Sequence, residues 1–328
     1  MTTIRTTNDQ SAVPTILEAA ATPNAEALSA AARRASTAQR KTRRSRITRY
    51  FARSSTSIAR YVILIVVAGV VIIPIVYAVL GGFKSNGQLV GNPLSIIPSP
   101  WVVSNYTDVL FGANAHYFWR EALNSVIIAT VAVFLTVGLA SLAAFTFARM
   151  VFRGREAFYL LFTLGLLFPS AVAILPLLIL VRQVGLENNL LGVALPQAAF
   201  GLPLTIIILR PFFKSIPVEL EDAAKIDGCG SFGFFWRILL PLARPALATV
   251  SVLAVVNTWN AFLLPLILLS GQDQWTLPLG VMNFSTQYVS DQARILAFTV
   301  VAIMPAILFY AFAERQLVSG LTSGAVKG

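Results

Sequence analysis

A short stretch of acidic and small residues between positions 217 and 228 carries the clearest chemical signal in this sequence. It begins with Pro217, which suits the first position of a helix, and it ends with Gly228, which suits the left-handed position that terminates one. Acidic side chains in the first turn are favoured by the helix dipole. Residues at helical spacing share one face that is small in its middle, namely Leu220, Ala223, Ala224 and Asp227. These features predict a short helix with one face that another surface can approach closely.

The residues that follow predict a second short helix, from Ser231 to Leu240, with Ser231 as its N-cap. This helix carries a run of aromatic side chains, which are Phe232, Phe234, Phe235 and Trp236. Aromatic side chains on such a loop need a partner. That partner is either another protein or the chain's own apolar helices, and the residues leave both alternatives open.

Catalytic chemistry has little support in the sequence. One cysteine, Cys229, excludes an intramolecular disulfide, and one histidine, His116, leaves no basis for a Cys/His metal cluster or a histidine-dependent triad. The pattern GxxxxGK[ST] does not occur, so the sequence has no glycine-rich loop for nucleotide phosphates. We therefore expect no enzyme activity, no metal and no cofactor, and any ATP must be hydrolysed by a partner.

Polar residues inside the long apolar stretches are few, and four residues there could bind a solute: Gln197, Asn257, Trp259 and Asn260. Asn257 and Asn260 are three positions apart and therefore share a helix face. Amides and aromatic rings suit the recognition of hydroxyl groups, so these residues are candidates for lining the path of a hydroxylated solute. The alternative is hydrogen bonding between membrane helices, which stabilises such bundles by about 0.6 kcal/mol per contact.

The elements that carry these residues are predicted to be membrane helices. Of the 328 residues, 56% are hydrophobic and 12% are charged, about half the charged fraction of a typical soluble domain. Apolar stretches free of Asp, Glu, Lys, Arg and His, each near the roughly 20 residues that cross a bilayer, span residues 61–83, 122–148, 157–181, 190–209, 246–269 and 295–313. A helix satisfies its own backbone in hydrocarbon. The expected fold class is all-α, a polytopic membrane bundle of six transmembrane helices.

Basic residues predict the orientation of this bundle, because Lys and Arg near membrane helices are retained in the cytoplasm. With the amino terminus inside, the inner side holds eleven basic residues before position 61, three in 149–156, five in 210–244 and two after 313. The outer side holds only Lys84, Arg120, Arg182 and Arg294. Both termini are therefore predicted to be cytoplasmic.

The net charge of +11 is concentrated beside membrane helices, so it does not indicate a nucleic-acid partner. Residues 1–60 are rich in Thr, Ser, Ala and Arg and are predicted to form a mostly disordered cytoplasmic tail. Such a tail serves as a topology signal, and a basic tail can also rest on anionic lipid headgroups.

Residues 219–245, ELEDAAKIDGCGSFGFFWRILLPLARP, resemble the cytoplasmic EAA loop of bacterial ABC-importer permeases. Further stretches resemble the carbohydrate-uptake branch of that family, which includes the smaller maltose permease subunit: Asn105-Tyr106, Arg120, Asn124-Ser125, Asn257 to Asn260 with Pro265-Leu266, and residues 320–328. The resemblance covers a permease domain at 61–328, with its coupling loop at 211–245, and does not cover the tail at 1–60. One residue departs from the motif, since Asp222 stands where a glutamate is usual.

The resemblance implies that the loop docks into a cleft on an ATP-hydrolysing subunit. The coupling residues would be Glu219, Glu221, Asp222, Ala223, Ala224, Asp227 and Gly228. In similar permeases the carboxyl-terminal tail reaches the interface between two ATPase subunits, which implies contacts from Leu321, Thr322, Gly324, Ala325 and Lys327. By itself this tail has too little apolar surface to offset the entropy of ordering, so it is predicted to order only in the assembled complex.

The implied partners are a second homologous permease subunit, two ATP-binding cassette subunits, an external solute-binding protein, a sugar substrate and membrane lipid. The implied location is the bacterial plasma (inner) membrane, and the implied function is to form half of a translocation path for a mono- or oligosaccharide. One alternative is an ABC permease for a different solute, such as a polyamine, a phosphonate or an amino acid. A secondary, ion-coupled transporter is disfavoured by the absence of charges in the apolar stretches. A structural or insertase-like membrane protein would give no reason for the coupling loop.

Overall fold

The computed structural model describes residues 60–113, 115–285 and 290–325, with side chains as far as residue 311. The basic tail at 1–59 lies outside these ranges, so its disorder stays a prediction. The chain divides into two compact units, Met1–Ile73 and Pro74–Gly328, and the helix Arg60–Gly82 crosses their boundary. The architecture below is that of the second unit. Within the described ranges the regular elements are helical, apart from an isolated antiparallel bridge between Ser285 and Ser290.

Four described helices are long and apolar enough to cross a membrane. They are Arg60–Gly82, α4 (Ala115–Arg149), α7 (Leu190–Ser215) and the Gln292–Ala311 part of α14 (Gln292–Ala325). Two bent helix pairs raise the number to as many as six if each pair is one span. The prediction of a helical, multi-span protein is therefore confirmed, whereas the count of six depends on how the bent pairs are counted.

The predicted span at 157–181 is wrong as a single helix. Helix α5 (Arg155–Leu164) and the short η1 (Gly165–Leu167) are followed by α6 (Ser170–Gln183) after a bend of 100°. The break lies at Phe168 and Pro169. A residue before proline avoids the helical region, and Phe168 has extended torsions, with φ −79° and ψ 118°.

The predicted span at 246–269 is also interrupted. Helix α11 (Arg244–Trp259) ends at Asn260, and α12 (Leu263–Leu268) follows after a short irregular stretch. Before α11, the elements α9 (Ser231–Phe234), η2 (Phe235–Leu239) and α10 (Leu240–Leu242) form one bent pair with it, at an angle of 79°. The other short elements are α2 (Asn86–Gly91), α3 (Ser104–Phe111), η3 (Gln272–Gln274), α13 (Leu277–Gly280) and η4 (Val281–Phe284).

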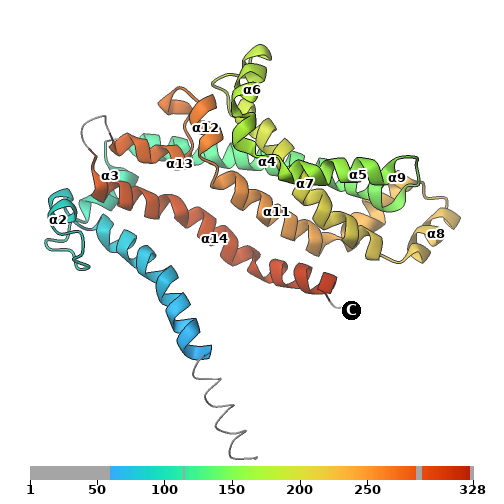
Figure 1. The fold of residues 1–328 in the computed structure, drawn as a ribbon, viewed down its shortest axis with the longest axis horizontal. Coiled ribbons are helices and arrows are strands. Elements are labelled where there is room, and N and C mark those ends of the chain that lie inside the picture. Colours follow the sequence, from blue (N-terminus) through green and yellow to red (C-terminus); the bar gives the residue numbers. More distant parts are fainter. Residues whose placement is uncertain (1–59, 114, 286–289, 326–328) are drawn as a thin grey trace, which may run out of the picture. The chain divides into compact units, whose positions relative to one another are not determined.

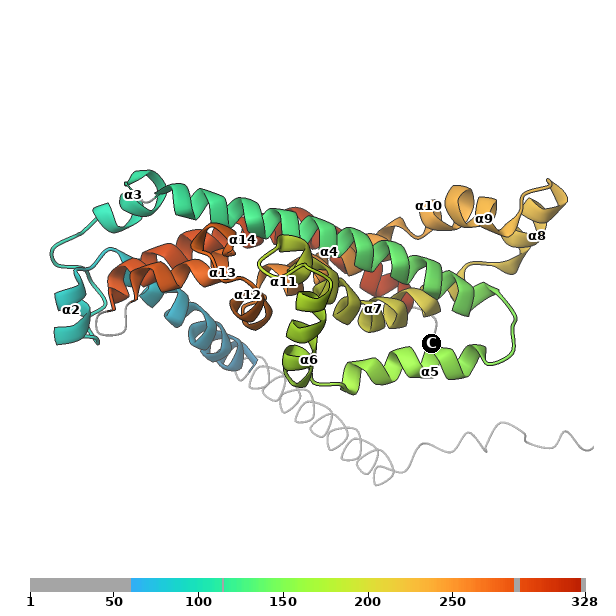
Figure 2. The same cartoon turned by 90° about the horizontal axis from the view of Figure 1, so that it is seen from above.

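Helices α4 and α7 form the most extensive helix pair of the second unit, and an apolar cluster lies near each end of α4. Figures 1 and 2 show α8 (Val218–Ile226) and α9 at one end of α4, and α3 and α13 at the other. The first cluster joins α4, α7, α8, α9 and η2 through Phe145, Phe213, Ala224, Phe234 and Phe235. The second joins α3, α4, α13 and α14 through Val109, Phe118, Leu277 and Phe298. The predicted docking helix is thus packed directly against the ends of the two central membrane helices.

Candidate functional site

Helix α8 forms at the predicted docking segment, and its two ends are defined by backbone geometry. Pro217 precedes the helix as its N-cap, with an extended ψ of 137°, so the helix begins one residue later than predicted. At the other end the Gly228 N–H donates to the Lys225 carbonyl at 3.0 Å and the Cys229 N–H donates to the Ala224 carbonyl at 2.8 Å. This pair of bonds is a Schellman motif. Gly228 has φ +75°, so its predicted left-handed role is confirmed.

The acidic residues of α8 divide between an inner and an outer face. The Glu221 side chain is only 15% exposed and forms ion pairs with Arg149 of α4 at 3.8 Å and with Lys225 at 3.1 Å. The hydrogen bond to Glu221 raises the pKa of Lys225, because it stabilises the charged ammonium group. Asp222 is 61% exposed and Glu219 is also exposed. Glu221 therefore faces Arg149 of α4. Glu219 and Asp222 lie on the exposed side of the helix, where Asp222 pairs with Lys225 at 3.5 Å.

The face of α8 that carries the small residues Ala223 and Ala224 is likewise divided between the protein core and solvent. Ala224 is buried in the cluster that contains Phe213 and Phe235, whereas Leu220, Ala223 and Asp227 are exposed. The four positions therefore do not share one exposed surface, and the coupling role of Ala224 stays a prediction. Four positions at this spacing cover a wide face of a helix. Ala224 lies at the edge of this face and packs against the chain's own core.

The aromatic segment after α8 resolves the two alternatives that its residues left open. Phe234 and Phe235 are buried in the same cluster as Ala224, and Phe232 and Trp236 are exposed. Gly230, with extended torsions, is the N-cap of α9, so Ser231 is the first helical residue and not the cap. One aromatic pair thus packs against the chain itself, and the other remains open to a partner.

A cavity of about 300 Å³ brings together three of the four residues predicted to line a solute path. Gln197 lies on α7, Asn257 lies on α11, and Asn260 directly follows α11; Ser170 of α6 and Thr258 of α11 complete the polar lining. Neither the Gln197 amide nitrogen nor its oxygen has a hydrogen-bond partner among the described residues, although both atoms are buried. An amide in this state can donate to one hydroxyl group and accept from another.

Trp259, the fourth predicted path residue, does not line this cavity. Its side chain is 9% exposed and belongs to the apolar cluster of Phe118 and Phe298. The helical period explains the difference, because Trp259 lies about 100° around α11 from its neighbour Asn260. Trp259 instead lines a separate cavity of about 930 Å³ beside α4, α11 and α14, and its place in a translocation path stays a prediction.

A polar network lies at the amino-terminal end of α4, the end away from α8. It includes Glu121, a charged residue directly before the predicted membrane stretch. Glu121 is fully buried, and its Oε1 accepts a hydrogen bond from Asn283 Nδ2 at 2.7 Å. Gln272 donates to Asn283 in turn. Asn124 Nδ2 donates to the carbonyls of Asp273 and Trp275, each at 2.9 Å. The loop between α12 and α14 is thus hydrogen-bonded to the first turns of α4.

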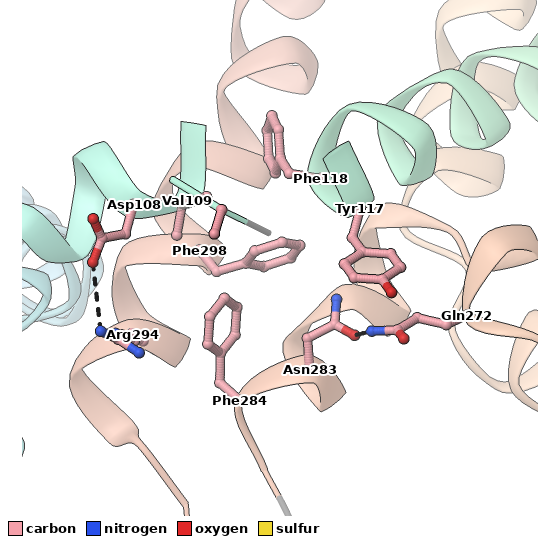
Figure 3. Close-up of a pocket in the computed structure, with 10 residues that line it drawn as sticks. Asp108, Val109, Tyr117, Phe118, Gln272, Asn283, Phe284, Arg294 and Phe298 are labelled. Atoms are coloured by element: carbon pink, nitrogen blue, oxygen red, sulfur yellow. Dashed lines mark hydrogen bonds and ion pairs between the residues drawn. The ribbon is translucent and has the colours of Figure 1, made fainter. Parts of the chain in front are cut away.

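An adjoining cavity of about 430 Å³ lies between α3, α4, η3, η4 and α14. Figure 3 shows Phe284 and Phe298 beside it, the ion pair between Asp108 and Arg294, and the hydrogen bond between Gln272 and Asn283. The predicted membrane stretch began at residue 122, and α4 begins at Ala115 and includes Glu121. The predicted stretch 122–148 is itself free of charged residues, and Glu121 lies directly before it in the same helix.

The carboxyl-terminal residues are predicted to order only in the assembled complex, whereas the structure of the single chain extends a helix into them. The backbone of α14 is helical as far as Ala325, so Leu321, Thr322, Gly324 and Ala325 continue this helix, and Lys327 lies outside the described residues. A segment that extends an existing helix needs no new nucleation, which removes the main cost of helix formation.

Comparison with known proteins adds the family context. Residues 135–321 match the family described as binding-protein-dependent transport system inner membrane component. The diacetylchitobiose uptake system permease protein NgcG of Streptomyces coelicolor is 34% identical, covering 81% of this chain and 88% of the relative. The arabinooligosaccharides transport system permease protein AraQ of Halalkalibacterium halodurans is also 34% identical, covering 80% and 93%.

A solved structure shares the fold. It is a crystal structure of a bacterial ABC transporter involved in the import of the acidic polysaccharide alginate, and it matches with a TM-score of 0.66 and 23% identity. The match covers 79% of this chain and 95% of the other.

Proposed function

Because the chain belongs to the family of binding-protein-dependent transport system inner membrane components, we propose that it forms half of the translocation path of a sugar importer and couples that path to ATP hydrolysis by a separate subunit. The observation that carries this proposal is the arrangement of α8. Its inner face is anchored to α4 and α7, and its outer face presents the exposed carboxylates Glu219 and Asp222. A rigid helix with one anchored face and one exposed acidic face can pass a partner's movement to the membrane helices.

The proposed contact with the ATPase subunit uses the outer residues of the predicted set. Glu219, Asp222, Ala223 and Asp227 would touch the partner, while Glu221, Ala224 and Gly228 would set the position and the end of the helix. The exposed side chains of Phe232 and Trp236 would extend the contact surface. The terminal residues Leu321, Thr322, Gly324, Ala325 and Lys327 would make a second contact.

The proposed substrate is a neutral oligosaccharide or a related hydroxylated solute. Two kinds of observation support this class: the relatives named above are permeases for diacetylchitobiose and for arabinooligosaccharides, and the cavity of Gln197, Asn257 and Asn260 offers amides without a charged side chain in its lining. Amides can donate to and accept from hydroxyl groups, and an uncharged lining suits a neutral ligand.

The proposed assembly contains a second permease, two ATP-binding cassette subunits and an external solute-binding protein. The excess of basic residues on the predicted inner side supports an orientation with both termini in the cytoplasm. The buried Glu121 would be a candidate proton-binding residue if the chain were a secondary transporter. Membership of a family of binding-protein-dependent systems disfavours that function. An ABC permease for a non-sugar solute is the stronger alternative.

Deletion of the gene and uptake of labelled solutes test this proposal. Cells without the chain should lose ATP-dependent uptake of one sugar from a panel that includes trehalose, arabinotriose and diacetylchitobiose, and a plasmid copy should restore it. Loss of amino-acid or polyamine uptake with normal sugar uptake would contradict the substrate class. A further comparison uses cells that are depleted of ATP but retain a proton gradient. If cells with the gene still took up the sugar under these conditions and the deletion abolished that uptake, the ABC mechanism would be contradicted.

A further inference from the structure

Two buried arginines bind the backbone of each other's helix at the end of the α4–α7 pair. Arg149, the last residue of α4, donates to the Phe213 carbonyl of α7 at 2.7 Å and to the carbonyl of Ile216, the residue that caps α7. Arg210 of α7 donates from Nε to the Phe147 carbonyl of α4 at 3.2 Å. Each arginine side chain is 8% exposed. We name this arrangement the arginine clasp.

Each arginine also contacts one further helix. Arg149 forms the ion pair with Glu221 of α8, described above. Arg210 forms an ion pair with Glu156 of α5, and its guanidinium lies 3.8 Å from the centre of the Tyr159 ring. The clasp therefore connects four helices, with the docking helix on one side and α5 on the other.

The chemistry of the clasp requires arginine. The last carbonyls of a helix have no partner within the helix, and Arg149 supplies donors to those of α7. A planar guanidinium can bond two carbonyls and face a carboxylate at the same time, whereas a lysine ammonium is a single point charge without this fixed fork. The mostly buried Glu221 carboxylate has two cations beside it, Lys225 of its own helix at 3.1 Å and Arg149 at 3.8 Å, and of these two only Arg149 links it to α4.

We propose that Arg149 is a positioning residue that fixes α8 relative to α4 and α7 through Glu221, so that a displacement of the docking helix is passed to the two central membrane helices. This inference rests on the proposed function of α8 as the docking helix. Arg210 and Glu156 make the corresponding connection to α5, so the clasp spreads the same movement to a third membrane helix.

Apolar packing is the competing explanation for the position of α8. Ala224 and the neighbouring phenylalanines form a buried cluster that could hold the helix without the ion pair. The two explanations differ in what removal of a charge does. If packing alone holds α8, neutralising Arg149 or Glu221 leaves the helix in place; if the clasp holds it, either change releases the helix.

The single cysteine of the chain provides the measurement. Cys229 follows α8 directly, donates its backbone N–H to Ala224, and is half-buried against the cluster. Its thiol should become more reactive when α8 leaves its place. The experiment measures the rate at which a maleimide labels Cys229 in the full-length chain, in open membrane vesicles without ATP or solute.

We expect Arg149→Gln and Glu221→Gln each to raise the labelling rate about fivefold or more, since an opening of this kind responds to losses of one or two kcal/mol. The double variant should not exceed the faster single variant, because both changes remove the same link. Arg149→Lys should give an intermediate rate. The matched control is Arg153→Gln, which neutralises an exposed arginine four residues further along and should leave the rate unchanged.

A general loss of stability is separated from the proposed effect by Thr136→Val. This change removes a buried hydrogen bond to the Ala198 carbonyl, within the membrane part of the α4–α7 pair, and should lower the melting temperature without changing Cys229 labelling. If Arg149→Gln does not accumulate in the membrane, Glu221→Gln carries the test. Unchanged labelling in Glu221→Gln, or additive effects in the double variant, would overturn the proposal. Because the assay needs neither ATPase nor sugar, its failure would leave the proposed transport function untouched.

Discussion

Glu121 at the start of α4 and Asn283 in η4 are joined by a hydrogen bond of 2.7 Å between Asn283 Nδ2 and Glu121 Oε1. The carboxylate is fully buried, and its second oxygen has no hydrogen-bond partner among the described residues. Gly280 makes room for this oxygen, because a Cβ at that position would overlap both Glu121 and Phe298. The bond is therefore part of the close contact between α4 and the loop that leads into α14.

Glu121→Ala should destabilise this contact, because it leaves the Asn283 amide without its acceptor. We expect a loss of about 1–3 kcal/mol in the free energy of unfolding, the usual cost of an unsatisfied polar group. The measurement is the melting temperature of the detergent-solubilised chain. Glu121→Gln keeps an acceptor oxygen and should cost less. In a double-mutant cycle with Asn283→Ala, the two losses should be less than additive, and strict additivity would show that the bond contributes nothing.

Gly228→Val should weaken coupling without any steric clash. No atom lies within 4 Å of the position of a Cβ at Gly228, so the cost comes only from φ +75°, about 1–2 kcal/mol for a residue with a side chain. We expect transport of the imported sugar to fall about fivefold to thirtyfold at equal protein level.

Gly230→Val is the matched control for this change. Gly230 also has open space around its Cβ position, but its φ of −70° suits any residue. Transport should therefore be close to normal in this variant. Equal transport in both valine variants would show that the left-handed end of α8 has no role in coupling.

Tyr106 provides a prediction about pH. Its hydroxyl donates to the Val79 carbonyl at 2.8 Å, and burial raises the pKa of Tyr106 to about 12. The unfolded chain ionises this group near pH 10. Its contribution to stability is therefore complete below about pH 10 and is lost as the pH rises towards 12.

Absorbance titration of the tyrosinates in detergent checks this prediction. The difference between the native chain and Tyr106→Phe should contain one tyrosine with a midpoint near pH 12, and the variant should lose less stability than the native chain between pH 10 and 12. If the tyrosine that is lost in the variant instead has a midpoint near pH 10, Tyr106 is exposed to water.

The local features of the docking helix could be predicted from the sequence because their causes are local. A glycine after a helical stretch, beside residues that cap the helix, predicts a left-handed end, and Gly228 has one. Long charge-free stretches predict membrane helices in the same way, since hydrocarbon thickness sets their length. The break at Phe168 also has a local cause in Pro169, but a proline in a membrane helix often causes only a kink, as Pro203 within α7 illustrates.

The contacts between distant residues could not be predicted in this way. Arg149 contributes to the topology count as one basic residue among 25, and nothing in its neighbours indicates that Glu221 is its partner. Ala224 and Trp259 were assigned to functional faces because helical spacing defines which residues share a face but not which face the core covers. The packing of α8 against α4 and α7 buries Ala224, and the packing of α11 against α4 and α14 buries Trp259.

Gln197→Leu separates the two roles that the sequence left open for the intramembrane amides. If Gln197 served to join helices, its amide would have a partner; yet both amide atoms are buried without one among the described residues, in the cavity shared with Asn257 and Asn260. Replacing an unsatisfied polar group by an apolar side chain of similar size should not destabilise the bundle and can stabilise it by about 1 kcal/mol. We therefore expect an unchanged or higher melting temperature together with uptake reduced about tenfold, the effect of losing roughly 1.4 kcal/mol of solute binding.

Thr136→Val is the control for this experiment, because the Thr136 hydroxyl does join helices, through its bond to the Ala198 carbonyl at 3.2 Å. The control should show the opposite pattern, with a lower melting temperature and nearly normal uptake per folded molecule. The two variants are compared by thermal unfolding in detergent and by uptake of the labelled sugar at equal membrane levels. A Gln197→Leu variant that melts earlier and transports normally would assign the amide to helix packing, and the cavity would then lose its strongest claim to be part of the path.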